Sequence, residues 1–159
     1  CMTNNLDLRA PAFFLADHAA VESGKLYING GFWNRLNFPS FPAVTTFGVA
    51  AVLSIPWRAY HQPHKFSVWF EDADGKKFGG DIGGDFTIGA SPEMKVGDST
   101  IMPIAALVGN FMIPNPGDYA AVLSVDGQEL SRWPFRAIQI FTQAVSTRPF
   151  PPIDPPAGE

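Results

Sequence analysis

The stretch that decides the fold is residues 65–71, KFSVWFE, followed by the Asp74-Gly75 pair and a second run over residues 76–82, KKFGGDI. In KFSVWFE the apolar side chains recur at every second position, and a period of two places them on one face of a β-strand. Gly75 accepts the positive φ that a tight hairpin turn requires. The segment therefore predicts a hairpin with one buried face, and with it an all-β domain.

The rest of the chain repeats this pattern of short apolar runs between turns. Gly and Pro each occur 15 times in 159 residues, which leaves little room for helices of ordinary length. A second Asp-Gly pair, Asp126-Gly127, predicts another hairpin. Further strands are expected over residues 12–18, 26–36, 44–55, 100–113, 118–125, 128–135 and 136–141. Eight or nine strands in one chain are typical of a single antiparallel β-sandwich.

The domain organisation follows from length and proline content. A chain of 159 residues suits one domain, which we expect over residues 9–145 after a short N-terminal extension over residues 1–8. Residues 146–159 contain five prolines. Because proline cannot donate a backbone hydrogen bond and favours extended polyproline geometry, these residues are expected to form a Pro-rich C-terminal tail outside the sandwich.

Charge and hydropathy exclude several classes of partner. The 11 Lys and Arg are scattered against 15 Asp and Glu, for a formal net charge of −4, so nucleic acid is not an expected partner. No apolar run is long enough for a membrane span, which favours a cytoplasmic protein. The single cysteine, Cys1, cannot form an internal disulfide. Met2 is expected to be the natural start, with a lipid-carrying Cys1 as the alternative.

Three signatures along the chain point to a family. The first joins LADHA at residues 15–19 to GKLYI at 24–28, and the second joins HKF at 64–66 to EDADGK at 71–76. The third joins PGDY at 116–119 to VDGQEL at 125–130. In this order they resemble a family of small bacterial and phage-encoded β-sandwich proteins catalogued as a domain of unknown function. The resemblance covers roughly residues 12–140. It implies a fold, a bacterial or phage source, and a virion location if the protein is phage-encoded.

Two groups of side chains invite a metal interpretation, and neither is complete. Asp72 and Asp74 begin a loop with carboxylates at alternate positions, but lysines follow where an EF-hand needs ligands, so a hairpin turn is expected instead. His61 and His64 lie in the loop sequence HQPH, which has no fixed geometry. No nucleophile elbow occurs in the chain. We therefore expect no metal, no cofactor and no enzymatic activity.

The residues that favour a binding role are aromatic, basic and apolar. Trp57, Arg58 and Tyr60 lie together in a predicted loop, and these residue types commonly anchor protein interfaces. The alternative is that Trp57 and Tyr60 cover one end of the core. In the tail, Phe150 and Ile153 lie between prolines and are candidate anchors in a groove. The sequence thus favours a non-enzymatic protein-interaction or structural module, whose partner is another protein or a second copy in a homo-oligomer.

A carbohydrate-binding sandwich is the alternative function. Such modules stack sugar rings on flat aromatic side chains, and the chain has four candidates, Trp33, Trp57, Trp69 and Trp133. This hypothesis requires at least one indole ring with a free face at the surface.

Overall fold

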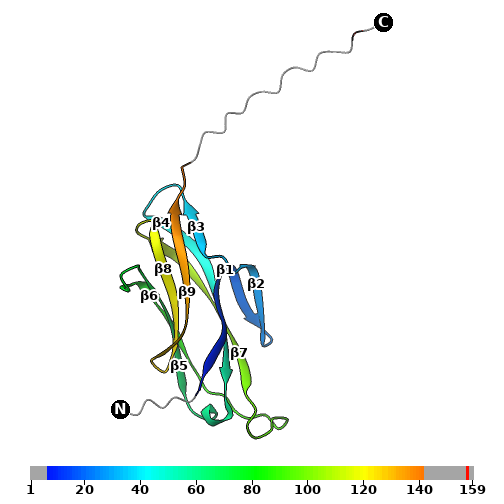
Figure 1. Ribbon diagram of the computed structural model, residues 1–159. Coiled ribbons are helices and arrows are strands. Elements are labelled where there is room, and N and C mark those ends of the chain that lie inside the picture. The colour runs from blue at the N-terminus through cyan, green and yellow to red at the C-terminus, as the bar shows by residue number, and fades with distance from the viewer. Residues whose placement is uncertain (1–6, 142–156, 158–159) are drawn as a thin grey trace.

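The computed structural model describes residues 7–141 and Ala157, and these residues form two β-sheets packed as a sandwich (Figure 1). A single turn of 3-10 helix, η1 (Trp57–Ala59), interrupts the strands. The strands of the described chain are β1 (Arg9–Glu22), β2 (Lys25–Gly31), β3 (Arg35–Phe38), β4 (Ala43–Ile55), β5 (His64–Glu71), β6 (Lys77–Phe86), β7 (Thr100–Ile113), β8 (Gly117–Val125) and β9 (Gln128–Gln139). The all-β sandwich is therefore confirmed.

One sheet has four strands in the order β2-β1-β4-β7, and the other has five in the order β3-β9-β8-β5-β6. Neighbouring strands are antiparallel, except that β3 runs parallel to β9. The β3–β9 pair is thus the exception, among the described strands, to the antiparallel pairing expected from the sequence. The expected strand over residues 26–36 breaks at Phe32, whose φ is +67°, and the chain crosses there from one sheet to the other.

The expected hairpin turns are present. Asp126 and Gly127 have φ of +51° and +79° and join β8 to β9, as a two-residue turn of this type requires. Gly75, with φ of +76°, lies in the turn between β5 and β6. The two strands expected over residues 128–135 and 136–141 form the single strand β9.

The main core lies between the two sheets and is rich in aromatic rings. Phe47 from β4, Phe70 from β5 and Phe111 from β7 meet at its centre, with centroid distances of 4.6–5.6 Å. Phe47 and Phe70 are 1% exposed and Phe111 is 3% exposed. Burying large aromatic side chains from both sheets supplies most of the hydrophobic free energy that holds the layers together.

Candidate interaction surface

The expected contact residues of the η1 loop cover one end of the core. Tyr60 is 5% exposed, and Trp57 packs against the same core cluster. Their rings lie 5.3 Å apart. Arg58 is exposed and lies 3.7 Å from the carboxylate of Asp7. The loop thus has the arrangement of the core-covering alternative, and the contact of Trp57, Arg58 and Tyr60 with a partner stays a prediction.

The two candidate anchors of the tail, Phe150 and Ile153, lie outside the described residues. Their role stays a prediction that rests on the sequence.

His64 connects this loop to the rest of the five-stranded sheet. Its buried ring places Nδ1 2.7 Å from Oδ2 of Asp126, and Nε2 2.7 Å from the carbonyl oxygen of Ala59. Both partners are acceptors, so both ring nitrogens donate when the imidazole is protonated. Burial lowers the pKa of His64, but the hydrogen bonds to Ala59 and Asp126 outweigh it and raise the pKa above its ordinary value.

The histidine pair and the aspartate pair do not have the geometry of a metal site. Both nitrogens of His64 are engaged by protein oxygens. Asp72 accepts hydrogen bonds from the backbone N–H groups of Asp74 and Lys76, at 3.0 and 2.9 Å, and so holds its own hairpin turn. Among residues 7–141 and Ala157, no three His, Cys, Asp or Glu side chains gather as a metal site would require.

Each of the four tryptophans is partly covered by the rest of the protein. Trp33, Trp57 and Trp133 pack against the main core. Trp69 lies on the side of β5 that faces away from the core, but the ammonium of Lys77 lies 4.1 Å from its ring centroid and covers one face. The carbohydrate-binding alternative gains no support from these positions and stays a prediction.

The largest apolar surface lies on the outer side of the four-stranded sheet. Along β1, β4 and β7, every second side chain points away from the core. We call this surface the outer face, and we include Phe32, which stacks on Phe14 at 4.1 Å. Apart from Arg9, which lies opposite Ser54, its residues are uncharged: Ala12, Phe14, Ala16, Phe32, Val44, Gly48, Ala50, Val52, Ser54, Ile101, Pro103, Ala105 and Leu107.

The outer face combines a buried centre with exposed large side chains. Phe14, Ala16 and Ala50 belong to a second buried cluster, separate from the main core. Around this cluster, Phe32, Val44, Ile101 and Leu107 are 59–67% exposed. Monomeric proteins rarely leave a contiguous apolar area of this kind open to water, because covering it is favourable.

The sequence holds a signal for this face. Residues 44–55 and 100–113 are apolar without regular alternation, which indicates strands buried on both sides. In the structure, β4 and β7 bury one side against the five-stranded sheet, while no described layer covers the other. The missing alternation therefore marks the candidate surface.

Comparisons with known proteins place the chain in a family. A model described as "Family of unknown function (DUF6941)" matches residues 11–138. The chain belongs to this DUF6941 family. The match confirms the resemblance to a domain of unknown function and covers nearly all of the DUF6941 sandwich, from β1 to β9. The bacterial or phage origin stays a prediction.

The other comparisons add little about this DUF6941 chain. No curated protein matches it. One similar solved structure is Pseudomonas fluorescens alkylpurine DNA glycosylase AlkC bound to DNA containing an abasic site analog, at 11% identity and a TM-score of 0.34. The alignment covers 79% of this chain and 30% of that one, and at this TM-score it carries no argument about function. Among the described residues, no helix has the length and hydropathy to cross a bilayer.

Proposed function

We propose that this protein is a non-enzymatic structural module that self-associates through the outer face of its four-stranded sheet. The observation that supports the proposal is the apolar outer face, charged only at Arg9 near its Ser54 end, with Phe32, Val44, Ile101 and Leu107 each more than half exposed. A second copy is the partner that the face fits by its size and by its shape. The cytoplasm and the virion, the two locations that the sequence favours, both suit such an assembly.

The size of the face matches the need of a stable dimer. The three strands β1, β4 and β7, about 4.8 Å apart, give a width of roughly 14 Å, and the 13 residues of β4 at about 3.3 Å each give a length of roughly 43 Å. The product is about 600 Å², which is at the lower end of the surface that each partner buries in a standard interface.

The face carries small residues beside large ones. Gly48 lies opposite Leu107 on the neighbouring strand, and Ala105 lies between Ile101 and Leu107 along β7. In the dimer that we propose, a twofold axis through the face sets large side chains of each copy against small residues of the other. Packing face to face also explains the composition better than pairing between β7 edges, because Pro103 lacks the N–H that a new ladder would need.

The test is the mass of the protein in solution for the wild type and for Leu107→Lys. Leu107 is 60% exposed, so the substitution leaves the fold intact. A twofold interface loses two leucine contacts of about 1.5–3 kcal/mol each. The dissociation constant should therefore rise at least about 100-fold. Sedimentation velocity over a dilution series measures it.

The matched control is Val96→Lys, which adds the same charge at an 85% exposed valine outside the outer face. This variant should sediment as the wild type does. A wild type that remains monomeric at the highest concentration reached, or a control that dissociates as much as Leu107→Lys, would overturn the proposal.

A further inference from the structure

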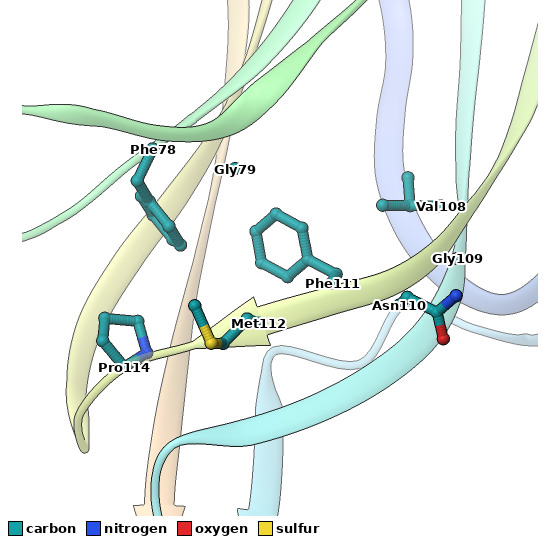
Figure 2. Close-up of a pocket in the computed structure, with 8 residues that line it drawn as sticks. All are labelled: Phe78, Gly79, Val108, Gly109, Asn110, Phe111, Met112 and Pro114. Atoms are coloured by element: carbon teal, nitrogen blue, oxygen red, sulfur yellow. The ribbon is translucent and has the colours of Figure 1, made fainter.

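A second apolar feature lies at the open side of the sandwich, between the edge strands β6 and β7. It is a groove of about 330 Å³. Figure 2 shows the rings of Phe78 and Phe111 side by side within it, with Met112 and Pro114 near one end and Val108 at the other. The two rings lie 5.3 Å apart. Each ring comes from a different sheet, so the groove opens where the two layers separate.

A glycine on β6 leaves room for the ring of Phe111 on one side of the groove. Gly79 has φ of +77°, and a Cβ atom at this position would lie 2.5 Å from Cε2 of Phe111. The glycine therefore lets the Phe111 ring reach the edge of the sheet. Met112, on the opposite wall, is 55% exposed. The result is an apolar groove that no described segment fills, with the partly buried ring of Phe78 on one wall and the ring of Phe111, which is 3% exposed, beneath it.

We infer that this groove binds the Pro-rich tail of the same chain, with Phe150 and Ile153 as the anchoring side chains. Aromatic-lined grooves are the surfaces that polyproline segments recognise, because the segment is stiff beforehand and loses little entropy on binding. Prolines cannot extend the edge of β6 or β7 as a new strand, since they lack the N–H groups for a ladder. Recognition through side chains is what remains, and the groove provides apolar walls for it.

The point where the described chain ends agrees with this occupant. β9 is followed by Ile140 and Phe141, which are 43% and 85% exposed, so the approach to the tail is already apolar. In the five-stranded sheet β9 and β6 are three strand spacings apart, or about 14 Å. From Phe141 to Phe150 is nine residues, which span about 28 Å at about 3.1 Å per residue. Phe78 lies level with Trp133, which is eight residues, or about 26 Å, back along β9 from Phe141, so the full separation is about 30 Å. Ile153, twelve residues beyond Phe141, can reach about 37 Å at about 3.1 Å per residue, which is enough to reach the groove.

The test follows the methyl groups of the methionines by NMR in the full chain. Met112 lines the groove, while Met94 and Met102 lie elsewhere and serve as internal references. The variant Phe150→Ser with Ile153→Ser removes both anchors. A docked Phe150 ring should shift the Met112 methyl signal, so this variant should move that signal by several linewidths. The signals of Met94 and Met102 should stay in place.

The matched control, Arg148→Ser with Asp154→Ser, changes the same tail twice but keeps the anchors, and should leave the Met112 signal unmoved. All samples carry Leu107→Lys, so that self-association cannot move the signal. An unmoved Met112 signal in the anchor variant, or an equal shift in the control, would overturn the inference. A shift that disappears on dilution would also overturn it, because a tail bound within its own chain does not depend on concentration.

Discussion

His64 is the residue whose protonation state the surrounding structure determines. A neutral imidazole carries one N–H, yet both ring nitrogens lie 2.7 Å from oxygens that only accept hydrogen bonds. The neutral ring would leave one nitrogen lone pair facing an oxygen lone pair in a buried position. The protonated ring satisfies both contacts, and its charge is balanced by Asp126. His64 therefore has a structural role, joining the η1 loop to the turn between β8 and β9.

Stability should consequently fall as pH rises. The pKa of His64 is about 6.5 in the unfolded chain and is raised in the folded protein. The folded state thus binds more protons between the two pKa values, and its advantage is complete below the unfolded pKa. The advantage is lost as pH rises through the folded pKa. Urea unfolding at several pH values from about 6 to about 9 measures this slope.

Asp126→Asn is the variant that isolates this effect. An asparagine tolerates the positive φ at this position, and its amide can donate to Nδ1 of a neutral His64 while Nε2 still donates to Ala59. The protonated form of His64 then has no carboxylate beside it, so the pKa of His64 should fall. The unfolding free energy should consequently depend less on pH. A ring titration by NMR that shows the same pKa in both proteins would contradict this account.

At the scale of single elements, β6 is the strand most dependent on glycine. Gly79 and Gly80 both have positive φ, but a Cβ atom at Gly79 would collide with Phe111, whereas one at Gly80 would meet nothing within 4 Å. Gly80→Ala should cost about 1–2 kcal/mol for the left-handed backbone alone. Gly79→Ala should cost clearly more, because Phe111 must also move. Chemical denaturation of the two variants measures the difference.

Gly80→Ala is thus the control for Gly79→Ala, since both carry the same backbone cost. Equal losses of unfolding free energy in the two variants would show that Phe111 moves aside freely. That result would remove the argument that Gly79 keeps the ring at the edge of the sheet.

The elements that the sequence predicts well are those specified by local chemistry. The hairpin between β5 and β6 and the hairpin between β8 and β9 follow from alternation and from Asp-Gly turns, which need no distant partner. The break at Phe32 could not be predicted in the same way. The glycines before it, Gly30 and Gly31, do not say where the chain goes next. The crossing to the other sheet depends on β9, a strand about 100 residues further along the chain.

The candidate surface shows a different limit of sequence reasoning. An apolar strand without alternation indicates burial on both sides, but a single chain cannot say whether the second cover comes from its own residues or from a partner. In β4 and β7, the side chains on one side pack between the two sheets, and those on the other side point away from the sandwich. The outer face is therefore identified from the structure, which shows two layers in the described chain. Trp57 and Tyr60, by contrast, are residue types shared by interfaces and cores, and only their burial separates the two roles.

At the scale of the whole molecule, the sandwich depends on contacts between distant parts of the chain. The indole N–H of Trp133 donates to the carbonyl of Trp33, and Gln139 donates to the carbonyl of Pro39, each across 100 residues. Such contacts form only after long loops have closed, which is slow. Refolding should therefore take milliseconds to seconds. Stopped-flow fluorescence of the tryptophans measures the rate, and a dominant microsecond phase would contradict the expectation.

The start of β1 and the end of β9 lie at opposite ends of the long axis of the sandwich. β1 begins beside the end of β4, where Arg9 pairs with Ser54, and β9 ends beside Phe38 at the far end of the sandwich (Figure 1). A pull on both ends would act along the strands and load the hydrogen bonds of each ladder in shear, all at once. The ladders could not open one bond at a time, so rupture under force would be slow. We therefore expect the domain to resist a pull applied between Arg9 and Gln139.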